Sequence, residues 1–354
     1  MITYIILFVL SIILILFNVK LIKRGANFNY LAPEITNGEK GISAIFIIFH
    51  HVSQQITLPP VFIVLDYIGF ICVAVFFFIS GYGLMYGIEH KENYLHGFFK
   101  KRILALMIPY WIVTIFDIIY HLIVNGIGQL DLLNLFLRLI AINAPWFITA
   151  ILFMYLGFWL FFKIALCVKR KNLGLILMTV YVILYVIGCI MLNLEGSYTA
   201  SISAFLLGLY WIKIQGWYLN WINKKYILKT IIILVAFMCC FTGRLFLAYK
   251  GINNNILHIF LRNVVSVLFI ITMLTVTQSV RFEGKIVSFL GKISYELYLV
   301  HITLMGFISI TLDPNHYVMI IVLCSIFVAF VLNLFDKFIL KLINRNIQKS
   351  DCKL

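Results

Sequence analysis

Long runs of apolar residues occupy most of this sequence. Eleven of them reach about the 17–25 residues that a helix needs to cross a bilayer. With 63% hydrophobic and only 12% charged residues, the composition excludes a soluble domain of this size. We therefore predict an all-α, polytopic membrane helix bundle of about eleven transmembrane helices. The predicted spans are 2–19, 41–58, 62–88, 103–124, 145–167, 173–194, 197–213, 228–249, 256–280, 287–311 and 316–340.

The basic residues orient these spans. When the loops are numbered in order, 24 of the 28 Lys and Arg residues fall in the odd-numbered loops and the C-terminal tail. Basic loops stay in the cytoplasm, so we expect the N-terminus outside and the C-terminus inside. The net charge of +15 then lies along cytoplasmic loops, and no nucleic-acid partner is expected. The other side has only Arg138, Arg244, Lys250 and Arg262.

The same pattern divides the chain into three parts. We expect an extra N-terminal span with its cytoplasmic loop at 1–36, a membrane domain at 37–342 and a basic cytoplasmic tail at 343–354. The run 2–19 lacks a preceding basic residue and a following small-residue cleavage site, so we interpret it as a span and not a signal peptide. The short segment 130–142 is expected at the outer surface.

Cysteines give no reason to expect a disulfide framework or a metal site. Six of the seven lie in apolar runs and none forms a Cys-x-x-Cys pair.

Three polar side chains are expected at one depth inside the membrane. Each lies nine to eleven residues from a charged residue at the cytoplasmic end of its span. At ~1.5 Å per residue this is roughly 13–17 Å from the inner surface. Ionisable groups at such depth are costly and are candidates for function. The alternative is that each one satisfies a polar neighbour in a packed bundle. The three are His51, Ser80 and His301.

Two further groups lie nearer the membrane surfaces. Basic residues at the inner ends of helices fit the phosphates of a cytoplasmic ligand, although snorkelling to lipid headgroups is the alternative; they are Lys40, Lys100, Lys101 and Arg102. A mixed group near the outer surface fits a sugar-binding vestibule, although structural ion pairs and an aromatic belt explain it equally well. It comprises Asp66, Asp117, His121, Trp146, Phe147, Arg244 and Arg262.

In these stretches the chain resembles the acyltransferase-3 family of integral membrane acyltransferases, which includes bacterial polysaccharide and cell-wall O-acetyltransferases. The Lys-x10-His pattern of that family corresponds to Lys40 and His51. Four further elements follow in order: Phe77-Phe78-Ile79-Ser80-Gly81, the basic helix KKRILALMIPYW, Trp146-Phe147, and Leu290 to His301, which includes Tyr298. Two positions depart from the family: its Asp is Asn37 here, and the second Arg of its RxxR pair is Ala105.

The resemblance implies a fold of ten core helices, to which 2–19 adds one, and a site. His51 would be the catalytic residue, as a general base or as an acyl carrier. Lys40, Lys101 and Arg102 would bind the acyl donor, acetyl-CoA, while Ser80, Tyr298 and His301 would support the reaction. Trp146, Arg244 and Arg262 would bind the acceptor. No metal is expected.

The expected function is transfer of an acyl group, acetyl above all, from cytoplasmic acyl-CoA to a hydroxyl of a cell-surface glycan or its lipid-linked precursor. The protein would be a multi-pass protein of a bacterial plasma membrane. Two other classes stay open. A transporter or flippase of lipid-linked sugars would bind its substrate with the same central polar groups but without acyl transfer, and an intramembrane sensor would show neither activity.

Overall fold

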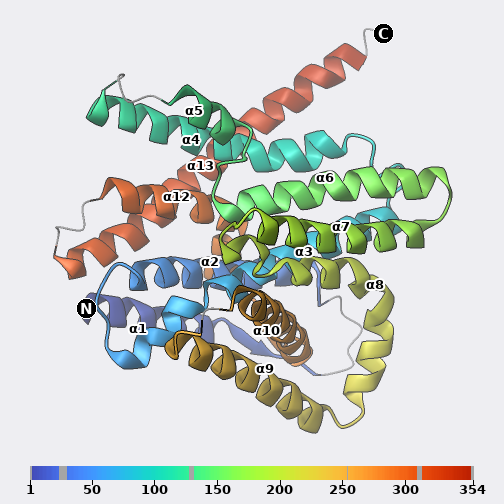
Figure 1. The fold of residues 1–354 in the computed structure, drawn as a ribbon, viewed down its shortest axis with the longest axis horizontal. Coiled ribbons are helices and arrows are strands. Elements are labelled where there is room, and N and C mark those ends of the chain that lie inside the picture. The colour runs from blue at the N-terminus through green and yellow to red at the C-terminus, as the bar shows by residue number, and fades with distance from the viewer. Residues whose placement is uncertain (1, 24–29, 127–130, 253, 309–312, 352–354) are drawn as a thin grey trace.

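The computed structural model describes residues 2–23, 30–126, 131–252, 254–308 and 313–351. Nearly all of this is helical, and most helices run along the long dimension of the molecule (Figure 1). The helices are α1 (Ile2–Phe17), α2 (Pro33–Ser53), α3 (Gly69–His90), α4 (Leu104–Asn125), α5 (Leu132–Leu139), α6 (Trp146–Cys167), α7 (Lys171–Met191), α8 (Ile202–Asn223), α9 (Tyr226–Tyr249), α10 (Asn255–Val276), α11 (Lys285–Lys292), α12 (Ser294–Phe307) and α13 (Pro314–Asp351). Short turns of 3-10 helix, η1 (Pro60–Tyr67) and η4 (Gly196–Thr199), and a π-helical turn, η2 (Phe99–Ile103), connect them.

Each of the eleven predicted spans overlaps a helix or a pair of helices. Among the described residues, seven helices are long and apolar enough to cross a membrane: α3, α4, α6, α7, α9, α10 and α13. Helix α1 has 16 residues and is about 24 Å long, short of a ~30 Å hydrocarbon core. The predicted span 287–311 is broken, because α11 ends at Lys292 and α12 begins at Ser294. The chain is thus a multi-pass helical membrane protein.

Two predicted boundaries were wrong. Helix α2 begins eight residues before the predicted span 41–58, with Pro33 in its first turn, where the missing N–H of proline costs no hydrogen bond. It ends at Ser53, because the chain turns into η1 at Pro60. Lys40 therefore lies inside the helix and His51 in its last turn, not at its middle. Helix α8 covers Ile202–Asn223 instead of 197–213.

A two-stranded antiparallel sheet interrupts the predicted all-α fold. Strand β1 (Val19–Leu21) pairs with β2 (Val280–Phe282), with Lys20 opposite Arg281. Three-residue strands carry too little alternation to be recognised from sequence. Their pairing joins two loops that the charge pattern assigns to the same side of the membrane.

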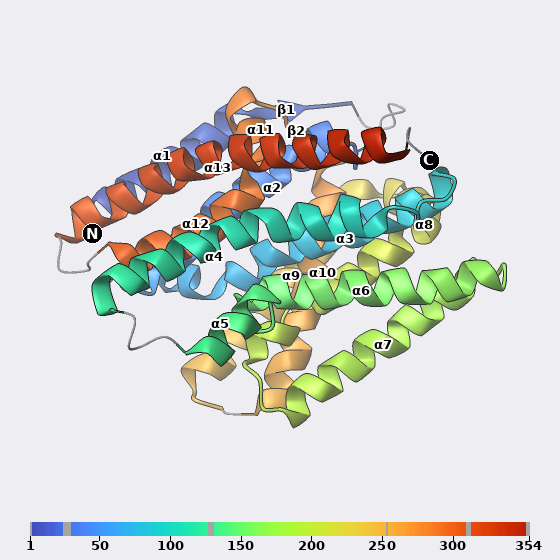
Figure 2. The same cartoon turned by 90° about the horizontal axis from the view of Figure 1, so that it is seen from above.

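Other contacts between loops agree with that alternation of sides. Lys171 forms an ion pair with Glu89 at 2.9 Å, which joins two odd-numbered loops. The backbone N–H of Thr3 donates to Asn315 at 3.0 Å, which joins the N-terminal end to an even-numbered loop. Figure 2 shows the start of α1 and the end of α13 at opposite ends of the bundle.

Glycines allow two pairs of helices to pack backbone against backbone. A methyl group added at Gly41 would lie 2.3 Å from the carbonyl oxygen of Val287, and one at Gly291 would lie 1.8 Å from that of Asn37. Helices α2 and α11 are therefore in direct contact. In the same way Gly81 of α3 and Gly208 of α8 each face a backbone carbonyl of the other helix, of Phe205 and Phe78. These contacts fix the positions of α2 and α3 in the bundle.

Helix α1 packs on the part of α2 that carries the histidines. The hydroxyl of the fully buried Tyr4 donates to the carbonyl oxygen of Phe49 at 2.9 Å. The rings of Tyr4 and Phe8 pack edge-on against Phe49, with centroids 5.3 and 5.4 Å away. The additional N-terminal helix thus holds α2 in place one turn or less from His51.

Candidate active site

His51 and His301 face each other between α2 and α12. Their ring centroids are 5.2 Å apart, although the two residues are 250 positions apart in the chain. His301 is fully buried, whereas His51 is half-buried. The prediction that the two imidazoles come to the same depth therefore agrees with the structure. The helices that carry them differ from the prediction, because His51 lies in the last turn of α2 and α12 is a separate helix from α11.

The surroundings of His301 leave one ring nitrogen available. Its Nδ1 lies 2.8 Å from the carbonyl oxygen of Leu297, to which it donates, and the neutral tautomer then has its lone pair on Nε2. This Nε2 is buried and has no hydrogen-bond partner among the described residues, and the same holds for the hydroxyl of Tyr298. The ring of Tyr298 lies 6.0 Å from His301 and packs edge-on against Phe147 at 5.1 Å.

A cavity of about 280 Å³ adjoins His51. Six helices and two turns line it, and the predicted acceptor residues Trp146, Arg244 and Arg262 all contribute, from α6, α9 and α10. Tyr298 closes one side, and Asp66 of η1 and Ser197 of η4 bring further polar groups. The structure thus brings the predicted catalytic histidine and the predicted acceptor residues to one cavity.

His50 also lines this cavity, but its ring is anchored elsewhere. Its Nδ1 lies 2.8 Å from the carbonyl oxygen of Leu65 in η1. The ring packs over Gly69, where an added methyl group would lie 2.2 Å from a ring carbon. Of the two adjacent histidines, His51 is the one that contacts the second imidazole.

Ser80 lies apart from this pair. Its hydroxyl accepts a hydrogen bond from Tyr155 of α6 at 3.3 Å, and it does not line the cavity of His51. Tyr155 also interacts electrostatically with the guanidinium of Arg102. Ser80 therefore belongs with the basic helix end and not with the histidines, which differs from the predicted grouping at one level.

The predicted donor cation Arg102 is held beside α3. It lies in the π-helical turn η2, an irregularity that often marks functional sites. Its Nε donates to the Tyr94 hydroxyl at 3.1 Å, and a methyl group added at Gly83 would meet only Arg102, at 4.0 Å. Burial raises the pKa of Tyr94, so its phenol stays neutral beside the guanidinium. Lys101 is exposed.

Lys40 is half-buried, and acidic groups face it. The charged groups that act on it most are the carboxylates of Glu296 and Glu39. Glu296 lies in the first turn of α12 and accepts a hydrogen bond from Asn333 of α13 at 2.8 Å. The hydroxyl of the adjacent Tyr295 donates to the carbonyl oxygen of Leu106 in α4. The neighbouring carbonyl of α4 has no helical hydrogen-bond donor, because Pro109 lacks an N–H. The first turn of α12 thus lies between the helix of Lys40 and the helix of Arg102.

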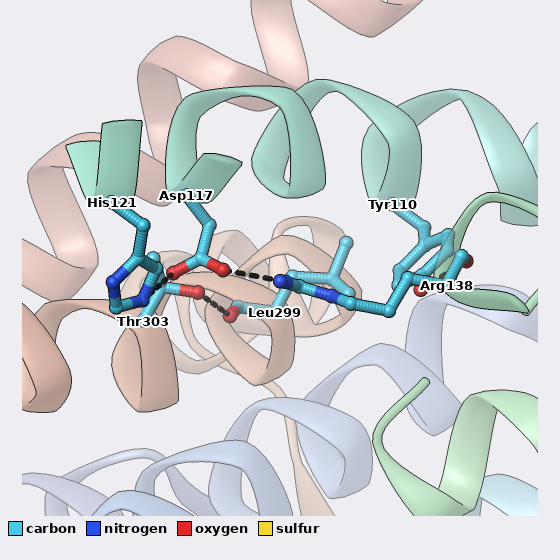
Figure 3. Close-up of polar contacts among 6 residues, drawn as sticks. All are labelled: Tyr110, Asp117, His121, Arg138, Leu299 and Thr303. Carbon is cyan, nitrogen blue, oxygen red and sulfur yellow. Dashed lines mark hydrogen bonds and ion pairs between the residues drawn. The ribbon is translucent and has the colours of Figure 1, made fainter. Parts of the chain in front are cut away.

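The predicted outer group divides into two. Asp117 and His121 of α4 do not line the cavity. Figure 3 shows Asp117 paired with Arg138 of α5, with Nη2 and Oδ2 2.5 Å apart, while His121 lies 3.7 Å from the same carboxylate. The hydroxyl of Tyr110 donates to the Arg138 carbonyl at 2.6 Å. These residues fasten α5 to α4, so the structural alternative applies to this half of the group.

Comparison with protein families identifies the family to which this chain is related. The model of the acyltransferase domain of the acyltransferase-3 family matches residues 37–334, which is most of the sequence. The chain belongs to the acyltransferase-3 family. It is therefore a membrane acyltransferase, and the resemblance inferred from its motifs is confirmed. No curated protein and no solved structure gave a match.

The acyltransferase-3 match includes most of α2 and all of α12, the helices that carry the two facing histidines. The match covers both His51 and His301 and ends inside α13. Helix α1 lies before the matched residues, and its role as an additional span stays a prediction.

Several residues of the site were not predicted from the sequence. Glu296, an acid within a predicted span, was detectable, because ionisable residues inside apolar runs are expected to have a role. Tyr67 and Phe70, which lie under Arg244, and Ser197 carry no local pattern that marks them. Among the described residues, no group of three or more His, Cys, Asp or Glu could hold a metal ion.

Proposed function

We propose that this membrane acyltransferase moves an acyl group, acetyl above all, from cytoplasmic acyl-CoA to a hydroxyl of a cell-surface glycan or its lipid-linked precursor. The observation that carries the proposal is the position of His51, which contacts His301 on one side and a polar cavity on the other. An imidazole at the edge of a pocket with aromatic and cationic walls suits acyl transfer to a sugar hydroxyl.

The donor is proposed to enter from the end of the bundle where the basic loops lie. Arg102 and Lys101 bind the phosphates of acetyl-CoA, and Lys40 assists from the other side of α12. Because a guanidinium forms two parallel hydrogen bonds to a phosphate, Arg102 contributes most. Ser80 and Tyr155, which are hydrogen-bonded near Arg102, lie along the route of the pantetheine arm towards His51.

His51 acts at the thioester in one of two ways. As a base it takes the proton of the acceptor hydroxyl; the oxygen attacks the thioester carbonyl, the C–S bond breaks, and the thiolate leaves as CoA and takes up the proton. As a carrier its nitrogen first displaces CoA, and the acceptor oxygen then displaces the imidazole. His301 and Tyr298 orient the His51 ring and exchange protons with it.

The test supplies acetyl-CoA labelled in the acetyl group to liposomes that contain the purified protein and the envelope glycans of the host. We expect label in the glycan as an alkali-labile ester, with release of one CoA per ester. A protein that moves lipid-linked sugar across the bilayer but transfers no label would instead be a transporter, and one that does neither fits a sensor.

The donor site has its own expected result. Arg102→Gln should raise the KM for acetyl-CoA about 10- to 100-fold with a smaller change in kcat, because a charged hydrogen bond to phosphate contributes roughly 1.5–3 kcal/mol. Lys224→Gln, a change of an exposed lysine outside the site, should leave both constants unchanged. Equal KM values for the two variants would contradict the role given to Arg102.

A further inference from the structure

Two arginines line this cavity without an acidic partner among the described residues, although buried arginines need one. Arg244 is 94% buried, and its Nε and Nη1 have no hydrogen-bond partner among the described residues. The Nε of Arg262 is likewise buried and unpartnered. Neither arginine takes part in any ion pair found within the described part of the chain. A buried charge without a partner is strongly destabilising, so a ligand that supplies the opposite charge would be bound firmly.

Protein groups offset only part of this cost. The guanidinium of Arg244 lies over the rings of Tyr67 and Phe70, 5.4 and 4.8 Å from their centroids. Among the described residues, two carboxylates line the cavities that these arginines border: Asp66, whose Oδ1 is buried and unpartnered, and Glu195 on the far side. Neither of them forms an ion pair with Arg244 or Arg262. Arg138 is the contrast, because Asp117 pairs with it at 2.5 Å (Figure 3).

The two arginines lie between two cavities. The cavity of about 280 Å³ beside His51 and a second one of about 540 Å³ share Tyr67, Arg244 and Arg262 as walls. The second cavity lies among the residues that follow α7 and α9, at the end of the bundle away from the paired strands, and the charge pattern assigns those loops to the outside. Gly196 makes room there, since a methyl group at this position would lie 2.7 Å from Nη1 of Arg262.

We infer that the acceptor carries an anionic group, a phosphate or a carboxylate, next to the unit that is acylated, and that Arg244 and Arg262 bind this group. The acylated unit occupies the cavity of His51, and the next unit of the acceptor occupies the larger cavity. This inference rests on the proposed function and adds the chemical class of the acceptor. Two guanidinium groups supply the forked donors that suit phosphate and carboxylate oxygens.

Acyl-transfer kinetics test the inference, because only the KM for the acceptor should change. Arg244→Gln and Arg262→Gln should each raise the KM for the host glycan tenfold or more and leave the KM for acetyl-CoA unchanged. On glycan whose phosphates have been removed and carboxylates esterified, wild type and variants should be equally weak. An advantage of wild type that persists on the neutralised glycan would overturn the inference. So would a defect of the variants that appears only in liposomes containing anionic phospholipid, since the bound phosphate would then be a lipid headgroup.

Binding tests the site even if no acyl transfer is found. In an uncharged detergent and without acetyl-CoA, glycerol 3-phosphate should raise the thermal midpoint of wild type, and glycerol should not. The shift should persist in Arg102→Gln, vanish in Arg244→Gln and return in part in Arg244→Lys. A shift that survives in Arg244→Gln and vanishes in Arg102→Gln would assign the anion site to the donor end and overturn the inference. No shift in wild type would overturn it as well, whereas absent turnover alone refutes only the proposed function.

Discussion

Replacement of His51 by glutamine is expected to reduce acyl transfer by at least about 100-fold and to leave the protein folded. Loss of a general base costs about 10²–10⁴-fold in rate, and loss of a covalent carrier costs more. Glutamine keeps the approximate size and polarity of the side chain at the edge of the cavity. The measurement is the rate of label transfer from acetyl-CoA to glycan, together with the KM for each substrate.

His96→Gln is the matched control, because His96 is exposed in the loop that precedes the basic helix end. It should transfer label at the wild-type rate. The two mechanisms for His51 separate when the glycan is omitted and the protein is analysed by mass spectrometry. An acetyl group on His51 indicates the carrier, and its absence under single-turnover conditions indicates the base. Undiminished transfer by His51→Gln would refute the catalytic assignment in both forms.

Replacement of Gly291 by alanine is expected to have the second large effect, on the fold. The added methyl group would lie 1.8 Å from the carbonyl oxygen of Asn37 and 2.5 Å from its carbon. These are backbone atoms of α2 and cannot rotate away, so α11 must separate from α2. Overpacking of this kind costs about 1–3 kcal/mol or more. We expect a lower yield of monodisperse protein in detergent and a lower thermal midpoint.

The control for this change is another glycine within a helix. Gly216 of α8 is exposed, and a methyl group added there meets nothing within 4 Å. Because alanine favours a helix over glycine by about 1 kcal/mol, Gly216→Ala should be as stable as wild type or more so. If Gly291→Ala behaves like Gly216→Ala, the contact between α2 and α11 does not determine the stability of the bundle.

Gly291→Ala is also expected to lower the acyl-transfer activity, because α11 is connected to the helices of both histidines. Helix α2 carries Asn37 at one end and His51 at the other, and α12, with His301, follows α11 after a single residue. A shift between α2 and α11 therefore changes how the two imidazoles meet. The folded fraction of Gly291→Ala should transfer acetyl more slowly than wild type, which Gly216→Ala should not.

The helical, multi-pass character of the chain could be predicted from sequence because membrane insertion depends on local properties. A run of apolar residues predicts a helix wherever it occurs, and the contacts of Lys171 with Glu89 and of Thr3 with Asn315 agree with the sides that basic residues assign to the loops. The ends of helices were less predictable. In α2 the first turn consists of the polar stretch after Pro33, which hydropathy does not count as part of a span.

The candidate residues were also found by a local rule, since ionisable groups in apolar runs stand out one at a time. Which of these side chains meet in the fold could not be predicted from short stretches of sequence. Ser80 and His301 have equal depth along their own helices, yet Ser80 bonds to Tyr155 and only His301 reaches His51. Asp117 and Arg244 were assigned to one vestibule, but Asp117 pairs with Arg138. Rotation of each helix about its axis decides such partners, and depth says nothing about rotation.

The sequence by itself determined that this protein is a multi-pass helical membrane protein of the acyltransferase-3 family, because span length, loop charge and ordered motifs are properties of short stretches. The tertiary structure alone decided that His51 meets His301 and that α1 packs against α2. It also decided that Arg244 and Arg262 share the cavity of His51 with no ion-pair partner among the described residues. Those relations join residues far apart in the chain. They depend on where glycines let backbones touch and on which face each helix turns inward.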